Sequence, residues 1–110
     1  MTIFLLNTLI VPIDFDKQTS ANIRLTKISL EEAKTLLSGN FTSAVGHEGT
    51  AQLLSNLLEI NVPVNRITVF LKKGDIAIHF FPKQRLPEGK VLSKEELSKI
   101  QFWLIKSEVL

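Results

Sequence analysis

The sequence contains no cysteine and no tyrosine, and only one tryptophan, among its 110 residues. Without cysteine the chain cannot form disulfides, zinc ribbons or a thiol nucleophile, so packing or association must stabilise it. No apolar run reaches the roughly 18 residues needed to cross a bilayer. The first residues also lack the basic start and small-residue cleavage site of a secretory signal. These absences predict a cytosolic protein without a membrane partner.

Motifs for metal or nucleotide-triphosphate chemistry are missing as well. The chain has no Gly-rich phosphate loop and no nucleophile elbow. Asp14 and Asp16 could bind a divalent ion, but two acids in a surface loop usually do not. His79 alternates with Ile78 and Phe80, as expected of a histidine on a sheet face rather than a ligand. We therefore expect no metal and no cofactor.

The chain carries little net charge, but the charge is unevenly distributed. The formal charge is +2, too small to indicate DNA binding. Residues 1–60 contain four basic and six acidic side chains, whereas residues 61–110 contain nine basic and five acidic ones. An anion site is therefore expected to draw on the second half of the chain.

The length and a hydrophobic content of 45% predict a single domain over residues 1–110. Apolar, β-branched runs predict five strands. Those at 66–71 and 76–81 read as a hairpin around the turn sequence KKGD. Helical spacing predicts three helices, two of them beginning with a capping box at Ser29 and Ser93. The other expected strands are at 3–11, 21–28 and 102–110, and the middle helix is at 46–59. The fold class is therefore α+β, with one mainly antiparallel or mixed five-stranded sheet.

One histidine stands between glycines at the expected start of a helix, in the stretch FTSAVGHEGTAQLL. The free N–H groups and positive end of a helix bind phosphate, and Gly46 and Gly49 leave room for it. A bound phosphate favours protonation of His47, which could then act as a general acid. Thr50 adds a hydroxyl one turn later. The alternative is that His47 only caps or packs at the helix end.

Further polar residues in the second half fit a phosphate site. Arg66 begins an expected strand, and Gln84, Arg85 and Glu88 occupy a loop framed by prolines. Arginine binds phosphate through paired hydrogen bonds, and glutamate can orient a histidine or accept a hydroxyl proton. A histidine, a glutamate and two arginines suffice for phosphodiester cleavage by a ribose hydroxyl without metal. Each of them could also be an ordinary surface residue.

The motifs FTSAVGHEGTAQLL, VPVNRITV and KQRLPEGKVLSKEEL, in this order and spacing, resemble the small viral ring nucleases. These are type III anti-CRISPR proteins of archaeal viruses, bacteriophages and related mobile elements, and the likeness is greatest to archaeal filamentous virus members. The resemblance covers nearly the whole chain. It implies a homodimer in the cytoplasm of the infected host cell. Such a dimer binds cyclic tetra-adenylate across its two-fold axis and cuts it into linear di-adenylates with 2′,3′-cyclic phosphate ends.

The resemblance also implies a role for each site residue. His47 would protonate the leaving 5′ oxygen, and Glu88 would assist it or engage the attacking 2′ hydroxyl. The expected ligand contacts are Asn7, Thr50, Arg66, Gln84 and Arg85. Gly49 departs from the family, because some members carry a small hydroxyl residue there. The alternative function is a non-catalytic module that sequesters a cyclic nucleotide or single-stranded RNA, with Trp103 as a stacking surface.

Overall fold

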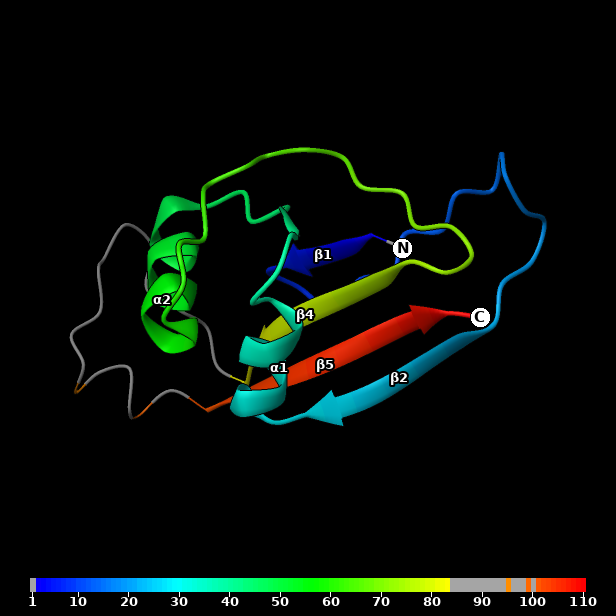
Figure 1. The fold of residues 1–110 in the computed structure, drawn as a ribbon. Helices are drawn as coiled ribbons and strands as arrows, with labels where there is room; N and C mark the ends of the chain where they lie inside the picture. Colours follow the sequence, from blue (N-terminus) through cyan, green and yellow to red (C-terminus); the bar gives the residue numbers. More distant parts are fainter. Residues whose placement is uncertain (1, 84–94, 96–98, 100) are drawn as a thin grey trace.

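The computed structural model describes residues 2–83, 95, 99 and 101–110. It contains five strands and two helices (Figure 1). They are β1 (Ile3–Leu6), β2 (Ile23–Ile28), α1 (Leu30–Leu36), β3 (Thr42–Ser43), α2 (Glu48–Leu58), β4 (Ile76–Pro82) and β5 (Phe102–Val109). The third expected helix, at 93–100, lies almost entirely outside the described residues.

The strands form one five-stranded sheet in the order β2-β5-β4-β1-β3. β1 pairs in parallel with both β3 and β4, while β5 pairs antiparallel with β2 and β4. The sheet is therefore mixed, and the α+β class is confirmed. Because β1, β3 and β4 point the same way, their carboxyl ends meet at one edge of the sheet.

The two described helices begin close to the positions that the sequence predicts. Ser29 caps α1 through a complete capping box, in which its hydroxyl accepts from Glu32 N at 3.1 Å and the Glu32 carboxylate accepts from Ser29 N. α2 has His47 as its N-cap residue and ends at Glu59, whose left-handed backbone conformation closes the helix.

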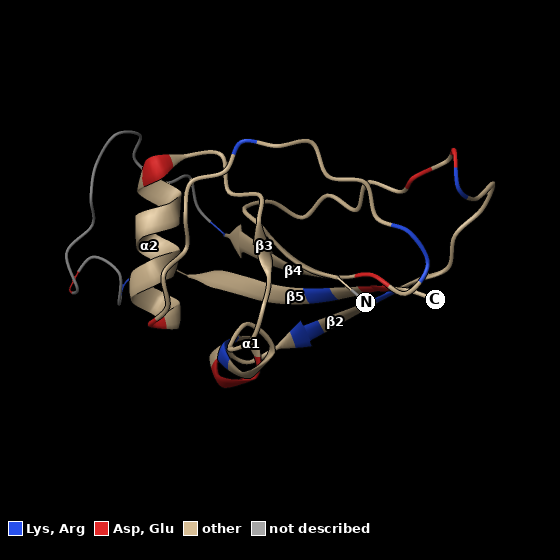
Figure 2. Cartoon of the chain, turned by 45° about the horizontal axis from the view of Figure 1, so that its top comes forward, with Lys and Arg blue, Asp and Glu red and all other residues tan. Residues whose placement is uncertain are grey.

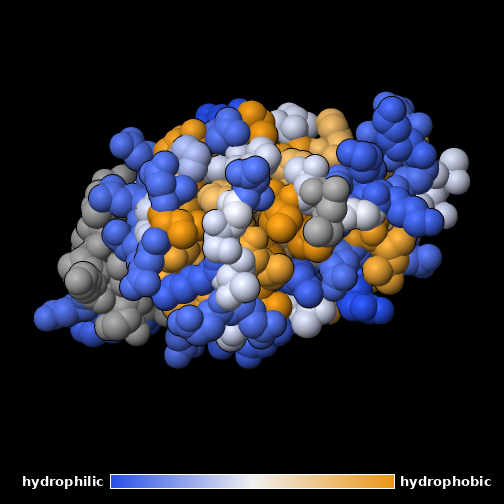
Figure 3. All heavy atoms as spheres, viewed as in Figure 1, coloured by the Kyte–Doolittle hydropathy of each residue, from blue (hydrophilic) through white to orange (hydrophobic). Residues whose placement is uncertain are grey.

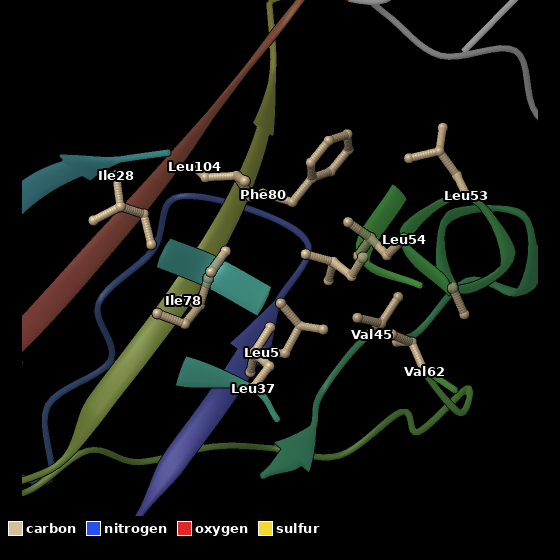
Figure 4. Close-up of a cluster of buried hydrophobic side chains, with 13 residues drawn as sticks. Leu5, Ile28, Leu37, Val45, Leu53, Leu54, Val62, Ile78, Phe80 and Leu104 are labelled. Atoms are coloured by element: carbon tan, nitrogen blue, oxygen red, sulfur yellow. The ribbon is translucent and has the colours of Figure 1, made fainter. Parts of the chain in front are cut away.

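Both helices lie on one face of the sheet, and the main core fills the space between the helices and the sheet (Figures 1 and 4). α2 contributes Leu53 and Leu54, which point toward Phe80 of β4 (Figure 4). The helical spacing of the leucines accounts for this packing, because residues three and four apart share one face. The core therefore fixes the position of α2, whose first turn carries His47.

The opposite face of the sheet is only partly covered. Its second core joins Leu6 and Ala77 of the sheet to Val69 and Leu71 from the connection between α2 and β4. Toward the other edge strand this face carries Leu25 and Trp103, which are 54% and 38% exposed. An apolar strip of the sheet therefore remains uncovered in the described chain.

The predicted hairpin between 66–71 and 76–81 is wrong. β4 pairs with β1 on one side and β5 on the other, so both of its edges are occupied. Residues 66–70 instead run without regular structure to a single parallel bridge between Leu71 and Ile13. The fifth strand is β3, which has two residues and is too short to show an alternating pattern. The first strand also ends at Leu6 rather than at residue 11.

Candidate functional site

The predicted site residues that the structure describes gather at the edge where the parallel strands end. Asn7 directly follows β1, and residues 44–47 lead from β3 into α2. β4 reaches the same edge with Pro82. Binding sites of α/β proteins commonly lie beyond the carboxyl ends of parallel strands, because the chain there departs from the sheet and frees its polar groups.

His47 projects into solvent from the start of α2. Its backbone is extended, with φ −126° and ψ 129°, and its carbonyl accepts the first helical bond from Ala51 N at 2.9 Å. Its imidazole makes no cap hydrogen bond and is exposed. His47 is thus the N-cap residue of α2 through its backbone alone, and its exposed ring is accessible to a ligand.

Arg66 lies beside Gly46, the residue that precedes His47, although the two are far apart in sequence. A Cβ atom placed on Gly46 would lie 3.5 Å from both Cγ and Nε of Arg66, so the arginine side chain runs along this glycine. Arg66 comes from the connection between α2 and β4, which passes the first turn of α2 in Figure 2. The fold thus places the Arg66 side chain against the residue that precedes the N-cap of α2.

Asn65 fixes this arrangement, a role that the sequence pattern did not reveal. Its amide Nδ2 donates to Ser43 O at 2.7 Å, and its backbone N donates to Val45 O at 2.8 Å. Ser43 completes the junction, because its hydroxyl donates to Pro63 O at 2.7 Å and accepts from Val45 N. The segment that carries Arg66 is therefore attached to the segment that leads into His47. The only signal in the sequence was the polar pair NR after Pro63.

The remaining predicted contacts divide into described and undescribed residues. Thr50 lies in the first turn of α2, half-buried, and Asn7 is half-buried at the end of β1. Gln84, Arg85 and Glu88 lie outside the described residues. The structure therefore brings His47 and Arg66 together and places Asn7 and Thr50 at the same edge.

His79, the other histidine, is part of the sheet and not of this site. It is fully buried, with Nδ1 2.9 Å from Thr8 O and Nε2 2.7 Å from the Ser107 hydroxyl. Burial lowers its pKa from the ordinary value of 6.5, and the weaker effect of the Thr8 carbonyl opposes this. The expectation of a sheet-face histidine is confirmed. Its contact with Thr8 O holds residue 8 against the sheet, and its contact with Ser107 joins β4 to β5.

Within residues 2–83, 95, 99 and 101–110, no three histidine or acidic side chains cluster closely enough to hold a metal ion. None of the helices in the described chain is both long and apolar enough to cross a bilayer. The chemical groups that the described edge presents are an imidazole, a guanidinium, a carboxamide, a hydroxyl and the N–H groups of α2. This set suits the binding of an anion and the transfer of a proton.

Residues 3–104 match the family described as STIV B116-like. The chain belongs to this family. In structure it is similar to B116 of Sulfolobus turreted icosahedral virus, with a TM-score of 0.81 and 26% identity over 98% of this chain and 99% of that one. The shared fold therefore extends over the whole molecule.

Sequence relatives come from archaeal viruses and from a bacterium. Protein 26 of Sulfolobus islandicus filamentous virus is 40% identical over 94% of this chain and 90% of its own length. ORF117 of Acidianus two-tailed virus is 42% identical over 93% of this chain and 88% of its own. YddF of Bacillus subtilis is 37% identical and is covered, like this chain, over 96%. The expected relationship to proteins of archaeal viruses, a filamentous virus among them, is confirmed.

Proposed function

We propose that this protein is a metal-independent ring nuclease that cleaves cyclic tetra-adenylate into linear di-adenylates with 2′,3′-cyclic phosphate ends. By removing this second messenger it would inhibit type III CRISPR immunity in the cytoplasm of an infected cell. The observation that carries the proposal is the exposed His47 at a helix N-terminus, whose side chain makes no cap hydrogen bond, with Arg66 packed against the adjacent Gly46. The resemblance of three sequence motifs to those of viral ring nucleases is the ground for proposing this substrate.

The chemistry proposed for this site is an internal transesterification. The 2′ hydroxyl of one ribose attacks the neighbouring phosphorus, and a 2′-O–P bond forms as the P–O5′ bond breaks. His47, as the imidazolium, gives its proton to the departing O5′, and Glu88 assists it or engages the 2′ hydroxyl. The proton of that hydroxyl passes to the Glu88 carboxylate or to solvent. Arg66 and the first N–H groups of α2 bind the phosphate oxygens as their charge increases. The step consumes neither water nor metal.

A second copy of the chain is part of this proposal. Cyclic tetra-adenylate has a two-fold axis, so two equivalent His47 residues can each cut one of two opposite bonds. The uncovered strip opposite the helices offers an apolar surface for that copy. It contains Leu25 and Trp103, and the Trp103 ring stacks on Phe81 with centroids 5.6 Å apart. Phe81 lies next to the last residue of β4, so this strip reaches the edge that bears the site.

The test incubates purified protein with cyclic tetra-adenylate in EDTA and follows the products by chromatography. We expect linear di-adenylate with a cyclic phosphate from the parent, and a loss of about 10²-fold or more in single-turnover rate for His47→Ala. Asn56→Ala is the matched control, since Asn56 is exposed near the other end of α2. Its rate should equal that of the parent.

Two outcomes contradict the proposal. If His47→Ala cleaves as fast as the parent, the histidine is not the general acid. If the ring binds tightly and is recovered intact, the protein is a module that sequesters a cyclic nucleotide. Single-stranded RNA is the other candidate for such a module, through the aromatic pair Phe81 and Trp103 and the Lys83 ammonium 5.6 Å from the Trp103 ring centre.

A further inference from the structure

A hollow of about 540 Å³ lies at the end of the molecule away from α2. Three lysines line it: Lys17, Lys72 and Lys73. The loop between β1 and β2 and the turn before β4 form its walls, close to the C-terminal residue (Figures 1 and 2). This surface is called the lysine hollow below. In Figure 3 the corresponding right-hand end of the molecule is mostly hydrophilic.

Hydrogen bonds join the chain segments that line the lysine hollow. The Gln18 side chain joins the two segments, because its Oε1 accepts from Lys73 N at 3.1 Å and its Nε2 donates to Ser20 O at 2.8 Å. The last residue is attached as well, since Leu110 N donates to Asn22 O at 2.8 Å. The positions from which the lysines extend are therefore fixed relative to one another.

The charges of the hollow are not neutralised within it. None of the three lysines makes an ion pair in the described part of the chain. Of the neighbouring acids, Asp75 accepts from Lys72 N at 3.1 Å and Asp14 accepts from Asp16 N. Asp14, Asp16 and Asp75 do not line the hollow, whereas Leu110, which bears the terminal carboxylate, does. Three positive charges against this one carboxylate leave the hollow net positive, which favours an anion as its occupant.

The other lining groups indicate which kind of anion fits. Thr19, Ser20 and Asn22 contribute hydroxyl and amide groups, which donate hydrogen bonds to phosphate oxygens. The lining contains no aromatic side chain on which a base could stack. A volume of about 540 Å³ suits a small molecule. We propose that the lysine hollow is a second ligand site, which binds an anion carrying two or more phosphate groups through those phosphates.

This site is separate from the one that contains His47. The lysine hollow adjoins the amino end of β4, whereas His47 lies at the edge where β4 ends. Seven residues of strand, about 20 Å, lie between the two edges. The inference therefore stands whether or not the protein cleaves cyclic tetra-adenylate, and its test does not use that ring.

The experiment titrates the isotope-labelled protein with inorganic pyrophosphate and follows backbone amides by NMR. We expect shifts at residues 17–22 and 72–73, and a Kd that rises with added NaCl. Lys72→Gln combined with Lys73→Gln should weaken binding about tenfold or more, since charge-assisted bonds to phosphate are lost. The control, Arg24→Gln combined with Lys27→Gln, removes the same charge from exposed positions of β2 and should change the Kd by less than about twofold.

Nucleoside diphosphate provides the second arm and separates the possible sources of the phosphate. Equal affinity for pyrophosphate and for ADP supports recognition through the phosphates alone. An affinity for ADP about tenfold higher, equal weakening by both pairs of substitutions, or shifts at residues 46–48 and 66 instead would overturn the proposal. Melting temperatures of both double variants within a few degrees of the parent establish that each variant is folded.

Discussion

Asn65 donates to the backbone of Ser43, the last residue of β3, and of Val45, two residues later. These bonds hold Arg66 against Gly46, the residue before His47. Asn65→Asp keeps the shape of the side chain but removes the donor to Ser43 O, and it sets a carboxylate against a carbonyl. We expect a loss of about 1 kcal/mol in the free energy of unfolding. If Asn65 positions Arg66, the variant should also cleave cyclic tetra-adenylate more slowly, because Arg66 no longer meets the phosphate correctly.

Asn61→Asp is the control for this prediction, because Asn61 is an exposed residue of the same connection. Its stability and cleavage rate should match those of the parent. The measurements are urea unfolding and single-turnover cleavage at saturating ring, which reports the chemical step rather than affinity. A destabilised Asn65→Asp variant with an unchanged rate would show that the residue is only structural.

His79 makes the stability of the protein depend on pH. Burial lowers its pKa below the ordinary 6.5, so the unfolded chain binds a proton more readily than the folded one. The contribution of His79 is fully present above pH 6.5 and is lost as the pH falls below that value toward the lower pKa of the folded state. Urea midpoints should therefore decrease between pH 7.5 and pH 5.5.

The variant His79→Gln tests the source of this dependence. It is less stable than the parent at pH 7.5, since one of the two ring contacts is lost, but its midpoints should vary much less over the same pH range. A parent and a variant with equal slopes would assign the dependence to other groups.

The residues of the candidate site could be predicted as types but not as an arrangement. The histidine among glycines and the arginine of the pair NR indicated phosphate chemistry, and the structure places Arg66 against Gly46, next to His47 in sequence. The bonds from Asn65 to Ser43 and Val45 join segments about 20 residues apart, and no local pattern encodes such a contact. The site residue types follow from the chemistry, whereas the contacts between them follow from the tertiary fold.

The sequence predicted the helices and strands that are specified by residues close together in the chain. The capping box at Ser29 and the leucine spacing of α2 depend on residues within one or two turns, and both helices are confirmed. The strand expected at 66–71 has the right composition, yet β4 already has two neighbours. β3 is formed because it lies beside β1, not because two residues prefer that conformation. Strand pairing is a choice between distant segments, so composition alone does not decide it.

The capping box of α1 gives an element-scale prediction. Ser29→Ala removes the hydroxyl that accepts from Glu32 N, and it should lower the free energy of unfolding by about 1 kcal/mol. Ser29→Asp restores an acceptor at the cap and should recover most of this loss. Urea denaturation measures both variants, and equal destabilisation by Ala and Asp would show that the cap bond contributes little.

At the scale of the molecule, the mixed sheet has one face under helices and the other only partly covered. Leu25 and Trp103 lie on that second face, exposed by 54% and 38%. Leu25 is opposite Ser107 of β5, and Ile105 lies on the same face of β5 between Ser107 and Trp103. The described residues of one copy leave this strip uncovered, and a partner that buried it would contribute about 25 cal/mol for each Å² of apolar surface. This strip is the described surface best suited to a second copy.

Leu25→Lys tests whether the strip is the dimer interface. A lysine there would be desolvated by a second copy but is tolerated in a monomer, since the leucine is already 54% exposed. We expect the parent to sediment as a dimer, and the variant to be monomeric at the same concentration with an unchanged melting temperature. Cleavage of cyclic tetra-adenylate should fall with the dimer fraction, because one copy provides only one His47.

Thr26→Lys is the control. It adds the same charge at the neighbouring position of β2, whose side chain faces the other way, and this variant should remain dimeric. A monomeric parent, or a Leu25→Lys variant that stays dimeric, would place the two-fold axis elsewhere or remove it.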